Sequence, residues 1–147
     1  MGKLTKSIEI EASPEEVFSF INDMEKMNDA LKGMLESKYT SEGPVGVGST
    51  MHVIERASGS HAEWDMEITE FVKNKKLATR TTRASKLKMA DLFTLEPTVR
   101  GTKMTYDNEY EVPYSLLGKL VDKLKVSKDM EKSMGKMLEN MKKALEA

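Results

Sequence analysis

The chain has 147 residues, of which 39% are hydrophobic and 32% charged, and we expect one soluble globular domain spanning residues 1–147. The formal net charge of −1 disfavours nucleic-acid binding, which normally needs a basic surface. Cysteine is absent, which excludes thiol catalysis, disulfides and cysteine-ligated zinc. The chain has no run of about 18 apolar residues, so no integral membrane segment is predicted. The N-terminus shows no apolar signal-peptide core, and we therefore expect a cytoplasmic protein.

The first predicted elements are a strand and two short helices. Residues 3–12 alternate between apolar and polar side chains, which is the period of a half-buried strand. Ser13, Pro14 and Glu16 then mark a helix start, because serine caps the first turn, proline suits its first position and the glutamate completes a capping box. A second helix is expected to start at Asn22–Asp23.

The middle of the chain predicts short strands joined by turns, which is typical of an antiparallel meander. The expected strands are Met34–Thr40, Thr50–Ala57, His61–Val72, Leu77–Arg83, Leu87–Glu96 and Lys103–Val112. A tight turn is expected at Ser58–Ser60. The glycines of residues 43–48 join two strands and do not open a helix, so we interpret them as a loop and not as a phosphate site.

The C-terminal part, residues 114–146, has one long helical pattern with a candidate break at Val126–Lys128. Its methionines recur at helical spacing and therefore share one face. Flexible methionine suits a plain core, a groove for a partner or one wall of a ligand pocket. We favour core packing, because a single terminal helix must bury its apolar stripe against the concave face of the sheet.

Several segments occur in the order of a known superfamily: SIEIEASPEEVFSFINDMEKM, GPVGVGSTMHV, EWDMEITEF, FTLEPTVRGTKMTYDNEYEVP and MLENMKKALEA. Over essentially its whole length the chain resembles the START-like, or SRPBCC, superfamily, in particular its polyketide cyclase/dehydrase and lipid-transport branch. The resemblance implies an α+β helix-grip fold, in which a curved seven-stranded antiparallel sheet wraps a long C-terminal helix and two short helices follow the first strand. The chain departs from this pattern at Lys26–Leu31, where relatives often have a tryptophan.

The resemblance also implies a cavity for an apolar ligand between the sheet and the C-terminal helix. We therefore predict a carrier or sensor of a small or medium hydrophobic ligand, such as a lipid, a polyketide-like molecule or an aromatic compound, with no cofactor. The alternatives are a cyclase or dehydratase acting on a polyketide-like substrate, and a non-enzymatic protein-interaction module. The short helices, the glycine-rich loop and the segment around Pro113 are expected to gate the cavity. The sequence carries no signal for an oligomeric state.

Alternation places polar side chains on faces that are otherwise apolar. Glu55, Asp91 and Asn108 are the three such residues, and polar groups of this kind orient a ligand in an apolar pocket. The two carboxylates would also suit acid/base catalysis. Alternatively, a bulge directs these side chains to solvent, or they pair with Arg80 or Arg83. The complete set of predicted cavity-lining residues is Met51, Val53, Glu55, Trp64, Met66, Asp91, Phe93, Tyr106, Asn108, Tyr110, Leu120, Met130, Met134, Met137 and Met141.

The two histidines, His52 and His61, fall on the polar faces of their strands and are expected to face solvent. Neither lies in an HxH or HxxxH arrangement, and metal sites need three or four converging ligands, so no metal site is predicted.

Overall fold

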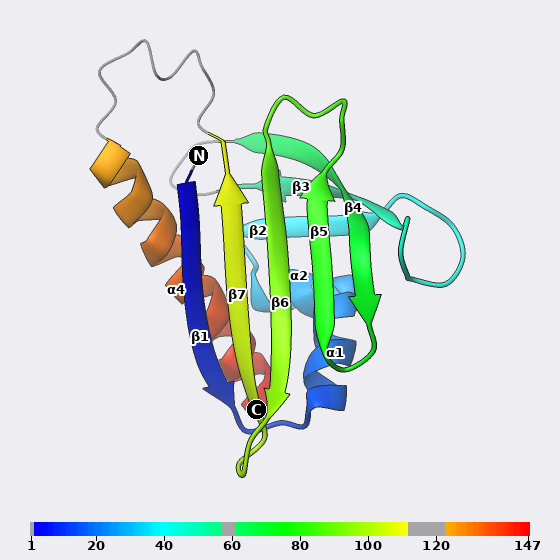
Figure 1. Ribbon diagram of the computed structural model, residues 1–147, viewed down its shortest axis with the longest axis vertical. Helices are drawn as coiled ribbons and strands as arrows, with labels where there is room; N and C mark the ends of the chain where they lie inside the picture. The colour runs from blue at the N-terminus through cyan, green and yellow to red at the C-terminus, as the bar shows by residue number, and fades with distance from the viewer. Residues whose placement is uncertain (1, 57–60, 112–122) are drawn as a thin grey trace.

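The computed structural model of the protein describes residues 2–56, 61–111 and 123–147, with side chains in the last range from residue 128 onward. Its elements follow the expected order (Figure 1). They are β1 (Gly2–Ile10), α1 (Pro14–Asn22), α2 (Met24–Ala30), β2 (Leu35–Tyr39), β3 (Thr50–Glu55), β4 (Ala62–Val72), β5 (Lys76–Thr81), β6 (Met89–Pro97), β7 (Thr102–Tyr110) and α4 (Lys123–Glu146). The turn predicted at Ser58–Ser60 and the segment around Pro113 lie outside the described residues.

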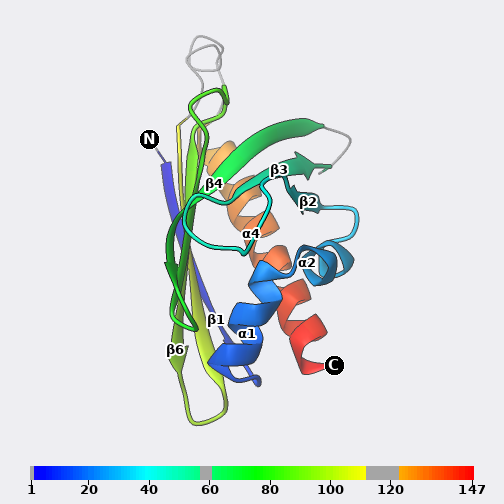
Figure 2. The same ribbon diagram turned by 90° about the vertical axis from the view of Figure 1, so that its right-hand side faces the viewer.

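The strands form one antiparallel sheet of seven strands in the order β1-β7-β6-β5-β4-β3-β2. The sheet is curved, and the three labelled helices lie on its concave side, with α4 next to β1 (Figures 1 and 2). This arrangement confirms the predicted helix-grip architecture. The break considered at Val126–Lys128 is wrong, because α4 continues through these residues without interruption.

The short helices start where their capping residues predict. The Ser13 side chain accepts a hydrogen bond from the Glu16 backbone nitrogen at 3.2 Å, and Pro14 occupies the first helical position. Asp23 ends α1 and also caps α2, because its carboxylate accepts from the backbone nitrogen of Lys26 at 3.2 Å. One residue therefore turns the chain between two helices that cover the concave face.

The long strand β4 contains a β-bulge that the sequence analysis did not foresee. The pairing of β4 with β5 shifts register between Ile68 and Glu70, which breaks the continuous alternation expected for residues 61–72. Before the bulge, Trp64 and Ile68 face the core. After it, Phe71 faces the same side and packs edge-on against Phe18 of α1, with 5.1 Å between ring centroids. The extra residue thus keeps the apolar side chains of β4 on the concave side.

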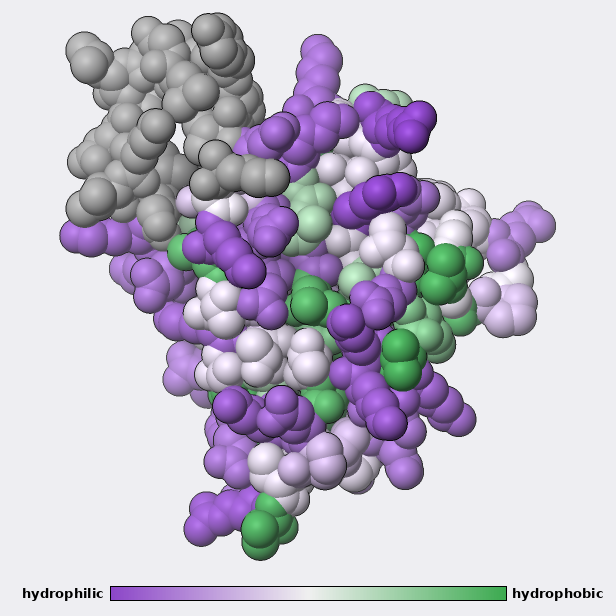
Figure 3. Space-filling view, viewed as in Figure 1, coloured by the Kyte–Doolittle hydropathy of each residue, from purple (hydrophilic) through white to green (hydrophobic). Residues whose placement is uncertain are grey.

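The C-terminal end of α4 is bound to the end of β1 by polar contacts. Glu146 accepts a hydrogen bond from the Glu11 backbone nitrogen at 2.9 Å, and the Lys142 ammonium donates to the Glu9 carbonyl at 2.6 Å. Lys142 and Glu146 also form an ion pair at 3.3 Å. The face of the sheet turned away from α4 is mainly hydrophilic, with a few apolar side chains scattered over it (Figure 3).

Alanine substitutions at two glycines are expected to change the free energy of unfolding in opposite directions. A Cβ atom at Gly101, in the β6–β7 turn, would press on the backbone of Ile10 and Ala12, whereas a Cβ at Gly135 of α4 would meet only the flexible end of the Lys6 side chain. We predict that Gly101→Ala lowers the free energy of unfolding by about 1–3 kcal/mol or more. Gly135→Ala should raise it by about 0.5–1 kcal/mol, because alanine favours helix.

Urea unfolding of both variants measures these changes. A stable Gly101→Ala variant would contradict the close packing between the turn and the end of β1.

Candidate functional site

On β1, β6, β7 and α4, side chains that face the concave side become less buried from one end of the sheet to the other, whereas most of those on β3 and β4 stay buried. At the lower end in Figure 1, which we call the sealed end, Ile10, Met104 and Met141 are all 0% exposed. At the opposite end, which we call the open end, inward side chains of the same three elements and of β6 are only partly buried. These are Leu4, Met89, Tyr110 and Met130. Along these four elements the concave face is therefore closely packed at one end and only partly buried at the other.

A polar cluster lies on the concave face near the open end, where Asn108 pairs with Leu4 of β1. Asp91 of β6 and Asn108 of β7 are paired across the strands. The Asp91 carboxylate accepts a hydrogen bond from the Tyr106 hydroxyl at 2.7 Å and a second from the Asn108 amide. Tyr106 is 8% exposed and Asn108 5% exposed, and the Tyr106 ring also packs edge-on against Phe93 at 4.7 Å. The alternation of β6 and β7 thus brings polar groups inward among aromatic and aliphatic neighbours.

Burial controls the ionisation of this cluster. Loss of solvent raises the pKa of Asp91, and the hydrogen bonds from Tyr106 and Asn108 oppose the rise only in part. Burial and the adjacent Asp91 charge hold the pKa of Tyr106 far above its usual value, so its hydroxyl remains a donor. Burial also raises the pKa of Glu55, whose charge contributes to the shift at Tyr106. The two carboxyl groups therefore share one poorly solvated interior.

Within the described part of the chain, no ion pair neutralises Glu55 or Asp91. Arg80, considered as an inward partner, instead pairs with Glu67 at 2.9 Å. Two buried polar atoms on the concave side also have no hydrogen-bond partner among the described residues: the Asn108 side-chain oxygen and the Trp64 indole nitrogen. Buried polar groups are normally paired, so unpaired ones mark a place where another molecule can supply the partner.

The other predicted lining residues fall into two groups. Those on β3, β4 and the second half of α4 belong to the buried core: Met51, Val53, Trp64, Met66, Met134, Met137 and Met141. Those nearer the open end are only partly buried: Glu55, Asp91, Phe93, Tyr110 and Met130. The ring of Tyr110 lies directly over Gly2, and a Cβ atom at this position would collide with the ring. Leu120 lies outside the described residues, and the role of all these residues as ligand contacts stays a prediction.

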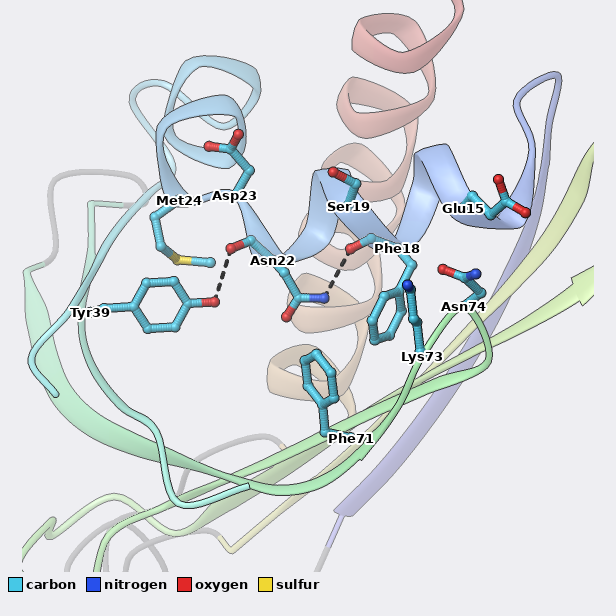
Figure 4. A pocket seen from close by; sticks show the side chains of 10 residues that line it. All are labelled: Glu15, Phe18, Ser19, Asn22, Asp23, Met24, Tyr39, Phe71, Lys73 and Asn74. Atoms are coloured by element: carbon cyan, nitrogen blue, oxygen red, sulfur yellow. Dashed lines mark hydrogen bonds between the residues drawn. The ribbon is translucent and has the colours of Figure 1, made fainter. Parts of the chain in front are cut away.

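A surface groove that the sequence analysis missed lies on the outer side of α1 (Figure 4). Its volume is about 970 Å³. Phe18 and Phe71 provide its apolar surface, and the remaining lining residues are Glu15, Ser19, Asn22, Asp23, Met24, Tyr39, Lys73 and Asn74. The groove combines α1, the start of α2, the end of β2 and the β4–β5 turn, which are far apart in the sequence.

Several polar groups of this groove hold the fold together. The Tyr39 hydroxyl donates to the Asn22 carbonyl at 2.9 Å, and the Asn22 amide donates to the Phe18 carbonyl at 2.9 Å (Figure 4). Burial and the charge of Asp23 raise the pKa of Tyr39 to about 12. These bonds secure the end of α1 and leave fewer groups for a ligand.

The histidines lie away from the concave face. His52 of β3 bonds to Asp65 at 2.9 Å through Nδ1 and to Glu63 at 3.0 Å through Nε2, and these bonds raise its pKa. His61 is exposed and pairs with Glu63 at 3.2 Å. Among residues 2–56, 61–111 and 123–147, no three histidine or acidic side chains converge as a metal site would require.

Comparison with known proteins agrees with this geometry. Residues 1–146 match the family described as polyketide cyclase / dehydrase and lipid transport. The chain belongs to this family. The match confirms the resemblance to the polyketide cyclase and lipid-transport branch of the SRPBCC superfamily. No curated protein sequence matches the chain.

Solved structures of similar shape place this family member among helix-grip proteins. The protein TTHA0849 from Thermus thermophilus has a TM-score of 0.83 at 19% identity, covering 98% of this chain and 97% of that one. Ara h 8.0201 has a TM-score of 0.71 at 13% identity, covering 98% and 97%. BexL, a di-domain ARO/CYC from the BE-7585A biosynthetic pathway, has a TM-score of 0.75 at 14% identity, covering 99% of this chain and 47% of BexL. At these identities the likeness establishes the fold alone.

None of the helices described for this polyketide cyclase family member has the length and apolar character needed to cross a bilayer. The candidate ligand sites are the partly buried end of the concave face and the groove beside α1.

The ionisation of Asp91 predicts a specific dependence of stability on pH. A carboxyl whose pKa is raised by folding stabilises the protein fully below its unfolded pKa, about 3.9, and this contribution is lost as the pH rises through the folded pKa. Asp91→Asn removes the charge but keeps an oxygen that can accept from Tyr106. We expect the variant to be more stable at pH 7 by about 1 kcal/mol, with the gain vanishing near pH 3. Thermal unfolding between pH 3 and pH 8 measures this, and a difference independent of pH would contradict the desolvation of Asp91.

Proposed function

We propose that this protein binds a small or medium hydrophobic ligand between the concave face of the sheet and α4, as a carrier or sensor. The observation that carries the proposal is the burial gradient: the sealed end is packed, while apolar side chains at the open end remain partly accessible. Ligand pockets are typically concave and apolar, with a few placed polar groups. The open end and the Asp91 cluster have this composition.

Binding would use the two kinds of side chain that meet there. Phe93 and the methionines Met89 and Met130 would cover the apolar body of the ligand, and flexible thioethers can repack around ligands of different shape. The polar cluster, held on the paired strands β6 and β7, would fix the orientation of the ligand. The ordered sheet supplies a rigid wall, so little freedom is lost there on binding.

A cyclase-type activity is a second candidate, favoured by the buried Asp91–Tyr106 pair and by the description of the family. Cyclisation of a polyketide-like substrate develops charge on an oxygen, which needs aimed donors for stabilisation. The Tyr106 hydroxyl already donates to Asp91, so its proton is directed at the protein. We therefore favour binding without chemistry.

Native mass spectrometry of gently purified protein tests the proposal. We expect a reproducible apolar adduct that extraction with organic solvent releases. Met89→Trp, which fills the open end, should abolish the adduct. Met24→Trp is the matched control, because Met24 is also partly exposed but lines the groove beside α1.

Two outcomes of this test contradict the proposal. Loss of the adduct in Met24→Trp but not in Met89→Trp would place the ligand in the groove. Absence of any adduct, together with no change in Trp64 emission on adding monodecanoylglycerol, would remove ligand binding altogether. Thermal unfolding of both variants shows whether they are folded.

A further inference from the structure

Resting on the function proposed above, we propose that the ligand of the concave face carries a hydrogen-bond-donating head group, a hydroxyl or a protonated amine, which Asp91 and Asn108 bind. The remainder of the ligand is apolar. Neither the family description nor the apolar side chains of the concave face specify the polarity of this head group.

The orientation of the Asn108 amide leaves one buried acceptor unused. An ionised carboxylate only accepts hydrogen bonds, so the Asn108 nitrogen must be the atom that faces Asp91. The side-chain oxygen therefore points elsewhere, and it has no partner among the described residues although Asn108 is only 5% exposed. Leaving a buried acceptor without a donor costs free energy, which a ligand donor would recover.

The groups around Asn108 add further acceptors. Both hydrogen bonds that Asp91 receives from described residues end on its Oδ1 atom, so among these residues Oδ2 has no donor and can accept from a ligand. Tyr106 commits its hydroxyl proton to Asp91 and offers no donor of its own. Glu55 contributes a second poorly solvated carboxyl group to the same interior. The described residues around Asp91 are therefore rich in acceptors; the unpaired donor described on the concave side, the Trp64 indole N–H, belongs to β4, which β5 separates from β6.

This arrangement discriminates against ligands with an acidic head group. A carboxylate placed beside Asp91 and Glu55 would meet charge of the same sign in a poorly solvated interior, where repulsion is strong. A hydroxyl would donate to Asn108 or Asp91, and an ammonium would in addition balance the negative charge. Long-chain alcohols and amines should bind, and fatty acids of the same length should bind poorly.

Four matched ligands test the inference: decan-1-ol, decylamine, decanoic acid and methyl nonyl ether, an isomer of decan-1-ol that lacks a donor. Trp64, the one tryptophan of the chain, lies buried on the concave side, and its emission reports binding below the concentration at which the ligands aggregate. We expect the alcohol or the amine to bind roughly tenfold or more tightly than the ether. Tighter binding of the amine indicates a cationic ligand, and tighter binding of the alcohol a neutral one.

Asp91→Asn should remove this preference, because an amide nitrogen replaces the free acceptor Oδ2 and can donate to the ether. Asp107→Asn is the matched control: Asp107 lies one residue along β7 from Asn108, on the opposite face, where Thr5 donates to it. It should keep the wild-type order of affinities. If Asp91→Asn does not fold, Asn108→Leu replaces it as the test variant, because it removes the unpaired acceptor without a change of charge.

The outcomes separate this inference from the proposed function. Equal binding of all four ligands, or tightest binding of decanoic acid, would overturn the inference and leave hydrophobic ligand binding intact. A donor preference that persists in both Asp91→Asn and Asn108→Leu would overturn the assignment to this cluster. Failure of all four ligands to bind would overturn both proposals.

Discussion

The packing of α4 against the concave face of the sheet is the interaction on which the rest of the structure depends. Met137, Leu138 and Met141 belong to the buried core where α4 packs against β1, and the contacts of Lys142 and Glu146 hold the C-terminus of the helix to the end of β1. A curved sheet exposes one large apolar surface, and a single helix covers only part of it. Ile10 and Met141 are fully buried near this contact, whereas Met130, toward the start of the helix, is only partly buried.

This uneven cover gives the polar cluster its chemical character. Asp91 and Asn108 lie on neighbouring strands of a mainly apolar wall, where Asn108 is buried and Asp91 partly buried. Such groups reduce stability unless they have partners. Their presence is easier to explain by recognition than by folding, because an apolar pair of similar size would pack in the same place without a desolvation cost.

Alternation in the sequence predicted the parts of this site that lie on regular strands. The inward positions of Asn108 and Asp91 follow from period-two patterns on β7 and β6, and both strands pair without irregularity. Phe71 was not predicted to face the core, because one extra residue in β4 reverses the faces beyond Ile68. The groove beside α1 depends on elements distant in sequence. The burial gradient depends on how much of the sheet α4 covers. Neither the groove nor the gradient produces a local pattern in the sequence.

Methionine methyl groups offer the most direct measurement of where a ligand binds, because methionines lie at both ends of the concave face and in the groove. In a carbon–proton NMR spectrum recorded during titration with decan-1-ol, the account predicts that the methyl resonances of Met89 and Met130 shift. Those of Met104 and Met141, at the sealed end, should stay nearly unchanged. Shifts confined to Met24 would instead place binding in the groove beside α1 and contradict the account.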